Sequence, residues 1–144
     1  MSSIYLHKDL FNSIAGYARE HLPKESCGLI AGHTDDRGRH IDKIYFLPNV
    51  DDACDHFSMD PKDQLEAVKD MRKNGYVPLG NWHSHPDTPS RPSNEDVSLA
   101  YDPGASYVII SFMADSPVIN SFHIADGTVT KEDLRIYSDE HPDW

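Results

Sequence analysis

Apolar side chains recur at helical spacing in two long segments of the chain. Residues 7–22 carry them every three or four positions, which predicts an amphipathic helix. A second helix is predicted from Asp60-Pro61, because proline is favoured at the first helical position, to Asn74-Gly75, where the apolar stripe stops. The apolar positions of the two stripes are Leu10, Phe11, Ile14, Ala15, Tyr17, Ala18 and Leu22, and then Leu65, Val68 and Met71.

Shorter segments with alternating or continuous apolar residues predict strands. They cover residues 26–33, 39–47, 77–85, 106–112, 117–124 and 128–137. Asp35–Gly38 and Asp126-Gly127 read as turns between two pairs of these strands, and a short helix is predicted over residues 94–100. The order of elements predicts an α+β or mixed α/β fold in which helices pack on a curved sheet.

Length and charge narrow the classes of function. A chain of 144 residues is expected to form one domain, here residues 1–137, followed by a tail at 138–144. Its 13 basic and 24 acidic residues give a net charge of −11, which disfavours nucleic acids and anionic membranes as partners. A basic or neutral protein partner suits this charge, although the charge can also serve solubility alone.

The sequence shows no targeting signal and few cysteines, which predicts an intracellular protein. No apolar run approaches the roughly 20 residues of a membrane span, and the N-terminus lacks a secretory pattern, so the cytoplasm is the expected compartment. Two cysteines are too few for a disulfide framework. Cys27 is predicted to be buried in an apolar strand, and Cys54, among acidic residues, to be a surface thiol.

The segment 83–96 contains the side chains of a metal site. His83 and His85 are two positions apart on a predicted strand, so their imidazoles face the same way. The proline-rich stretch 86–92 cannot continue the strand, and Asp96 follows in the first turn of the short helix. Two imidazoles and one carboxylate are a common catalytic zinc set with a fourth position for water. The remaining histidines show no such spacing and are predicted to be structural or surface residues: His7, His21, His33, His40, His56, His123 and His141.

Other residues near this segment have competing explanations. Ser93-x-x-Asp96 is also a helix capping box, which needs no metal. Glu25 precedes the strand that begins at Ser26 and, taken alone, is interpreted as a solvated loop residue. Trp82 is predicted to pack in the core behind the metal strand rather than to contact a substrate. The residues alone leave these alternatives open.

Together these segments resemble the JAMM (MPN-type) zinc metalloproteases. The resemblance rests on Glu25 before a Cys-Gly strand and, about sixty residues later, on His-Ser-His-Pro-x6-Ser-x2-Asp at 83–96. It extends from Ile4 to Tyr137, nearly the whole chain. It implies a curved mixed sheet flanked by two long helices and a short metal-site helix, in a cytidine-deaminase-like arrangement.

The resemblance also implies a role for each site residue. His83, His85 and Asp96 would bind one zinc ion. Glu25 would act as the general base on the zinc-bound water, and Ser93 would help to hold the oxyanion of the tetrahedral intermediate. Family members cleave peptide or isopeptide bonds after ubiquitin or ubiquitin-like proteins. This chain lacks the insertions of the eukaryotic members and is similar to the small prokaryotic branch, which trims residues or amino-acid adducts from ubiquitin-like sulfur-carrier proteins.

Several other functions are compatible with parts of the sequence. RadC-like bacterial proteins, which are linked to nucleic acids, share a similar motif, but Ser84, the short N-terminal region and the acidic charge argue against them. Many MPN domains are non-catalytic scaffolds, but those lack the ligands. A metal-binding protein without catalysis, or a ferrous iron site, would not explain Glu25 and Ser93 as well as hydrolysis does. An exposed sheet edge or helix face would support a homodimer.

Overall fold

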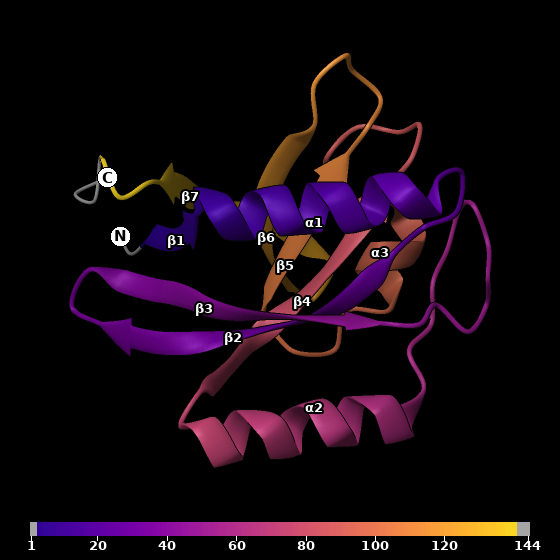
Figure 1. Cartoon of the computed structure of the whole chain (residues 1–144). Coiled ribbons are helices and arrows are strands. Elements are labelled where there is room, and N and C mark those ends of the chain that lie inside the picture. Colours follow the sequence, from indigo (N-terminus) through magenta and orange to yellow (C-terminus); the bar gives the residue numbers. More distant parts are fainter. Residues whose placement is uncertain (1–2, 141–144) are drawn as a thin grey trace.

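A computed structural model describes residues 3–140 and places a mixed sheet between two helices (Figure 1). Within this range the strands are β1 (Ser3–His7), β2 (Cys27–Asp35), β3 (Gly38–Leu47), β4 (Val77–His85), β5 (Ser106–Ser111), β6 (Val118–Ala125) and β7 (Thr128–Tyr137). The helices are α1 (Lys8–His21), α2 (Pro61–Asn74) and α3 (Asn94–Ser98). The predicted mixed α/β class is confirmed, whereas the cytidine-deaminase-like arrangement stays a prediction.

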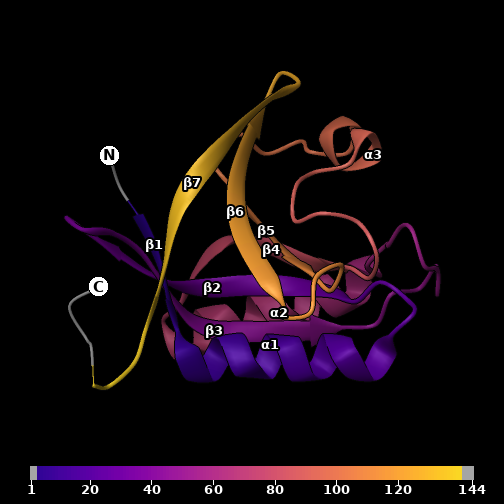
Figure 2. The same ribbon diagram turned by 90° about the horizontal axis from the view of Figure 1, so that it is seen from above.

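The sheet closes on itself. Its strands pair in the order β1-β3-β2-β4-β5-β6-β7, and β1 also pairs with β7, which makes a barrel. β1 runs parallel to both of its neighbours and β4 runs parallel to β5, whereas the other pairs are antiparallel. The sheet is therefore mixed, and Figure 2 shows the strong curvature of β6 and β7.

β1 is the element that the sequence analysis missed. Four of its five residues are buried, and so short an apolar run does not reveal its period. The following helix was predicted to begin at residue 7. In the structure His7 is instead the N-cap of α1, because its Nδ1 accepts a hydrogen bond from the backbone N–H of Asp9 at 3.0 Å. Without β1 the sheet would not close.

The two longer helices cover opposite sides of the β2–β3 pair (Figure 1). α1 packs on the larger cluster of the core through Ile14, and α2 packs on a smaller cluster through Met71. Because neighbouring strand residues point to opposite faces, Ile30 belongs to the first cluster and Ala31 to the second. Met71 is 2% exposed, so its replacement by alanine should cost about 2–5 kcal/mol.

The remaining sequence predictions are met in most respects. The other predicted helices and strands are present, and their ends agree to within two residues. Cys27 is buried and Cys54 is exposed, as predicted, and both thiols are free. No helix in residues 3–140 combines the length and the apolar character needed to cross a membrane. The division into a domain at 1–137 and a tail stays a prediction, and residues 141–144 of that tail lie outside the described part.

Candidate metal centre

β4 carries both histidines of the predicted site into the interior. It lies between β2, to which it is antiparallel, and β5, to which it is parallel. Because side chains alternate along a strand, His83 and His85 share one face, and both are 3% exposed. Ser84 points the other way, and its hydroxyl accepts a hydrogen bond from the backbone N–H of Ser26 at 2.7 Å. Pairing on both sides thus holds the imidazoles on a fixed backbone.

Trp82 packs behind the site, as predicted. It is fully buried, and its indole N–H donates a hydrogen bond to the carbonyl oxygen of Tyr45 at 3.1 Å. Gly28 pairs with Trp82 across β2 and β4, and a side chain at this glycine would overlap that carbonyl oxygen and the indole nitrogen. The Cys-Gly pair of the motif therefore leaves room for the tryptophan that supports the histidine strand.

Asp96 brings a carboxylate to the two imidazoles. Its Oδ2 lies 3.1 Å from Nε2 of His83 and 3.2 Å from Nε2 of His85, and the two Nε2 atoms are 3.1 Å apart. A tetrahedral zinc ion with bonds of about 2.0–2.1 Å separates its ligand atoms by roughly 3.3 Å. The three atoms therefore have nearly the spacing of three corners of a zinc site, and the donor types fit this ion.

The loop between the ligands orients His85. The imidazole Nδ1–H donates a hydrogen bond to the carbonyl oxygen of Pro89 at 2.8 Å. Because a carbonyl oxygen only accepts, Nδ1 must carry a proton, so in the neutral imidazole that binds a metal Nε2 has the lone pair. The loop itself is anchored by Ser90, whose hydroxyl donates to the carbonyl oxygen of Ile109 in β5 at 2.6 Å.

Ser93 and Asp96 form a complete capping box at the start of α3. The hydroxyl oxygen of Ser93 accepts a hydrogen bond from the backbone N–H of Asp96 at 3.1 Å, and the carboxylate of Asp96 accepts one from the backbone N–H of Ser93 at 2.9 Å. The cap uses a lone pair of the hydroxyl, so its proton stays available for a substrate oxygen. The two explanations of Ser93 are therefore compatible.

Glu25 is buried, which corrects its interpretation as a solvated loop residue. It is 6% exposed, its backbone N–H donates to the carbonyl oxygen of Ala53 at 2.8 Å, and its carbonyl oxygen accepts from Asn49 at 3.1 Å. Its Oε1 is buried and finds no hydrogen-bond partner among residues 3–140. Burial, opposed by His85 and assisted by Asp96, raises the pKa of Glu25 to about 8. A buried carboxyl with an unpaired oxygen is suited to proton transfer.

Asn49 is a positioning residue that the sequence analysis missed. Its amide group donates hydrogen bonds to the carbonyl oxygens of Glu25 and His56, and its Oδ1 accepts from the backbone N–H groups of Asp51 and Ser58, all at 3.1 Å. These four bonds fold the loop after β3 around one side chain. A Pro-Asn pair after a strand signals a turn, but only the fold shows that this turn holds Glu25.

Burial and hydrogen bonds set the charge state of each predicted ligand before a metal binds. Burial lowers the pKa of His83, which favours the neutral imidazole that a metal requires. Burial acts the same way on His85, but hydrogen bonds to Asp96 and to the carbonyl of Pro89 outweigh it and raise the pKa of His85. Burial acts to raise the pKa of Asp96, yet hydrogen bonds from the two imidazoles hold this pKa well below its ordinary value. Asp96 is therefore a carboxylate at neutral pH.

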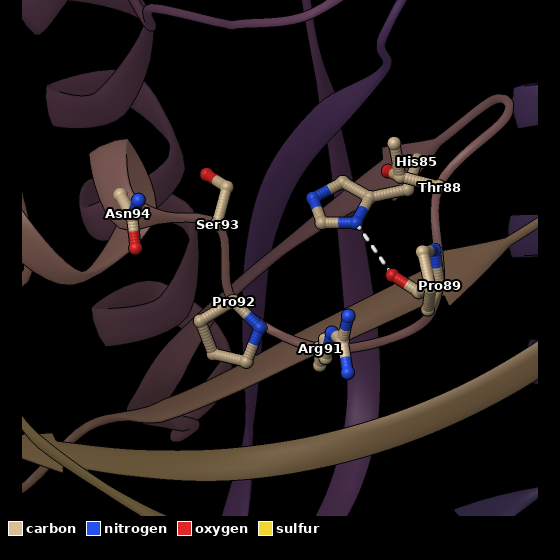
Figure 3. Close-up of a pocket in the computed structure, with 7 residues that line it drawn as sticks. All are labelled: His85, Thr88, Pro89, Arg91, Pro92, Ser93 and Asn94. Carbon is tan, nitrogen blue, oxygen red and sulfur yellow. Dashed lines mark hydrogen bonds between the residues drawn. The ribbon is translucent and has the colours of Figure 1, made fainter.

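A pocket of about 310 Å³ opens beside the site (Figure 3). The imidazole of His85 is directed toward Ser93 in this pocket. Its volume lies at the lower end of the range for small-molecule sites. The residues that line it are His85, Thr88, Pro89, Arg91, Pro92, Ser93 and Asn94.

A second group of metal-type side chains lies on the β2–β3 hairpin. His33 and His40 are directly opposite in the strand register, their ring centroids are 4.5 Å apart, and Asp35 completes the group. Each imidazole already contacts a carboxylate, His33 that of Asp42 at 2.6 Å and His40 that of Asp35 at 2.8 Å. The spacing along the chain did not reveal this group, because it depends on strand register. His141 lies outside the described residues.

Comparisons with known proteins found one family and several similar proteins. A family model described as prokaryotic homologs of the JAB domain matches residues 7–125. The CysO-cysteine peptidase of Mycobacterium tuberculosis is 32% identical over 136 residues, which are 92% of this chain and 90% of that protein. The desampylase of Haloferax volcanii is 30% identical over 118 residues, 76% and 81% of the two chains. A solution structure of a Desulfitobacterium hafniense protein is 48% identical, covers 94% of both chains and has a TM-score of 0.87.

Proposed function

Because the chain belongs to the family of prokaryotic JAB-domain proteins, we propose that it is a zinc-dependent peptidase that hydrolyses an amide bond at the C-terminus of a ubiquitin-like sulfur-carrier protein. One observation carries the proposal. The ligand atoms of His83, His85 and Asp96 meet at 3.1–3.2 Å, and the buried carboxyl of Glu25 interacts electrostatically with two of these residues. The names of two relatives, a CysO-cysteine peptidase and a desampylase, support this reaction class.

Each site residue has a place in the reaction. A zinc ion held by His83, His85 and Asp96 would supply a Lewis acid that polarises the scissile carbonyl and makes water acidic near neutral pH. Glu25 takes a proton from water as the water oxygen bonds to the carbonyl carbon. The hydroxyl of Ser93 donates a hydrogen bond to the carbonyl oxygen as negative charge develops there. Glu25 then returns the proton to the amide nitrogen as the C–N bond breaks, which leaves a carboxyl group on the carrier and a free amine.

The surroundings of Glu25 suit a group that accepts a proton and then releases it. Burial strengthens the carboxylate as a base, since it raises the pKa to about 8, and a nearby dication would lower this pKa toward neutral. The hydrogen bonds from Glu25 to Ala53 and from Asn49 to Glu25 fix its backbone, so less of this residue must be ordered at each turnover. Glu25 can therefore serve first as base and then as acid.

The substrate class follows from the relatives and from the size of the site. The Mycobacterium relative is named for a CysO-cysteine bond, and this chain matches 90% of its length. An extended Gly-Gly tail, typical of ubiquitin-like carriers, has no side chains that would clash at a narrow site. We therefore assign the C-terminal tail of such a carrier as the acyl part of the substrate.

The test is hydrolysis of a sulfur carrier that ends in Gly-Gly followed by one cysteine. Zinc-loaded wild-type protein should remove the added residue, which intact mass spectrometry detects. Glu25→Gln should keep the zinc but lose most of the turnover, because glutamine cannot accept the proton. Glu66→Gln, on the exposed surface of α2, is the matched control and should retain full activity. A zinc-loaded wild type that leaves every carrier unchanged would indicate a non-catalytic module instead.

A further inference from the structure

We infer that the pocket in Figure 3 binds the free α-carboxylate of the amino acid that is released, and that Arg91 is the counter-charge. The inference rests on the proposed function and adds a substrate preference to it. The enzyme would remove a single amino acid from the carrier in preference to separating the carrier from another folded protein.

The pocket adjoins the reacting groups. His85, a predicted metal ligand, and Ser93, the predicted oxyanion donor, both line it. At about 310 Å³ it has room for an amino acid but not for a folded protein. A small group bound here therefore lies beside the scissile bond.

Arg91 is the only permanently charged residue among those that line this pocket. Its side chain makes no hydrogen bond or ion pair with any residue in the described range 3–140. By contrast, Lys24 pairs with Asp52 at 2.6 Å. A guanidinium without a partner is available to a carboxylate, which it binds through two parallel hydrogen bonds.

The backbone that carries Arg91 is held in place. The N–H of Arg91 donates to the carbonyl oxygen of Pro89 at 2.8 Å. The neighbouring Ser90 donates through its hydroxyl to Ile109 at 2.6 Å and accepts at its carbonyl oxygen from the amide of Asn120 at 3.1 Å. Because the loop is already ordered by β5 and β6, less entropy is lost when Arg91 binds a ligand.

Apart from the proposed metal ion, the charge around the pocket would oppose a carboxylate if Arg91 were absent. The chain has a net charge of −11, and Glu95 and Asp96 lie in the first turn of α3, directly after the pocket loop. Arg91 offsets this repulsion for a leaving group that carries its own α-carboxylate. A leaving group that is the lysine side chain of a folded protein presents no α-carboxylate at this distance and gains nothing from Arg91. The preference for a single amino acid follows.

The test compares two forms of one substrate. A ubiquitin-like sulfur carrier ends in Gly-Gly and one further cysteine, whose terminal carboxylate is either free or converted to an amide. For the wild type, kcat/KM should be about tenfold higher for the free acid, as expected for charge-assisted hydrogen bonds. Arg91→Ala should lower kcat/KM for the acid about tenfold and remove most of the preference. Arg72→Ala, at the exposed end of α2, is the matched control and should retain the preference.

Binding supplies a readout that does not need turnover. In a Glu25→Gln background, calorimetry should show weaker binding of the acid substrate after Arg91→Ala, with zinc content and Tm unchanged. Equal kcat/KM for the two forms in the wild type, or a preference that survives Arg91→Ala, would overturn the inference and leave the proposed peptidase intact. A wild type that cleaves neither form would refute the proposed function and this inference together.

Discussion

Ser93 and Asp96 hold each other through two reciprocal hydrogen bonds, and one carboxylate oxygen in this pair also faces both imidazoles. Oδ2 of Asp96 is 2.9 Å from the backbone nitrogen of Ser93 and 3.1 and 3.2 Å from Nε2 of His83 and His85. The cap that starts α3 therefore orients a predicted metal ligand as well. The capping box that starts the helix and the predicted metal site therefore use the same carboxylate.

Ser93→Ala should consequently affect both stability and turnover. Loss of the cap should cost about 1 kcal/mol, or roughly 3 °C in Tm. If the hydroxyl also binds the oxyanion as proposed, its loss should lower kcat by roughly 100-fold. Thermal melts and steady-state kinetics measure the two effects, and Ser93→Thr should restore both because it keeps a hydroxyl.

Asp60→Ala is the matched control for the cap. Asp60 caps α2, where its carboxylate accepts a hydrogen bond from the backbone N–H of Lys62 at 2.8 Å. This variant should lose a similar amount of stability and keep its turnover. If Ser93→Ala behaved in the same way, Ser93 would be a cap without a part in the reaction.

Zinc binding should depend on β4 and not on the β2–β3 hairpin. Replacing His83 and His85 together by alanine should reduce bound zinc from about one ion per chain to none, because two of three ligands are lost. Replacing His33 and His40 together removes as many imidazoles but should leave about one tightly held zinc ion. Metal analysis after dialysis against a weak chelator distinguishes the pairs, and zinc loss only from the hairpin variant would exclude the predicted ligands.

Removal of the metal should make stability depend on pH through Glu25. In the metal-free protein burial raises the pKa of this carboxyl from 4.5 to about 8. The unfolded chain therefore releases the proton at lower pH than the folded protein does, so the folded state loses stability as pH rises from about 4.5 to about 8. Glu25→Gln has no such titration. In the presence of chelator, the free energy of unfolding of Glu25→Gln should exceed that of the wild type by a few kcal/mol at about pH 8, or roughly 5–10 °C in Tm. At about pH 5 the two values should differ little.

Thermal melts at the two pH values, with Glu66→Gln as the control, measure this difference. Glu66 is exposed on α2, so its replacement should leave the pH profile of the wild type unchanged. The same advantage of Glu25→Gln at both pH values would show that Glu25 does not titrate abnormally in the folded protein.

Asn49→Ala should separate zinc content from turnover. It removes the four hydrogen bonds that organise the loop beside Glu25, which should lower stability by about 1–3 kcal/mol. The predicted ligands lie on β4 and α3, so zinc should be retained while kcat falls at least about tenfold. Asn74→Ala, which removes a hydrogen bond to the carbonyl oxygen of Asp70 in α2, should not change kcat. Unchanged kcat in Asn49→Ala would mean that Glu25 does not need this loop.

Local periodicity was enough to predict that the four polar side chains of the segment 83–96 would lie together. His83 and His85 are two positions apart on a strand, and Ser93 and Asp96 are three apart at a helix start. The pitch of a strand and of a helical turn sets these relationships, so no distant residue is needed to recognise them. The end of α2 at Gly75 was also predicted from the sequence, because a glycine commonly follows the last turn of a helix. In the structure Gly75 has a φ of 75°, which favours glycine.

Only the tertiary structure determined the surroundings of Glu25 and of the pocket. Glu25 looked solvated in the sequence, but in the fold it is buried. Its backbone is hydrogen-bonded to Ala53 and Asn49 in the loop after β3, and the neighbouring Ser26 is hydrogen-bonded to Ser84, 58 residues away. The sequence also did not reveal the closure of the barrel by β1, or that the guanidinium of Arg91 has no partner among residues 3–140. Burial and strand register depend on many side chains packing at the same time. A carboxyl acquires an unusual pKa from what covers it, and the sequence around it does not contain that information.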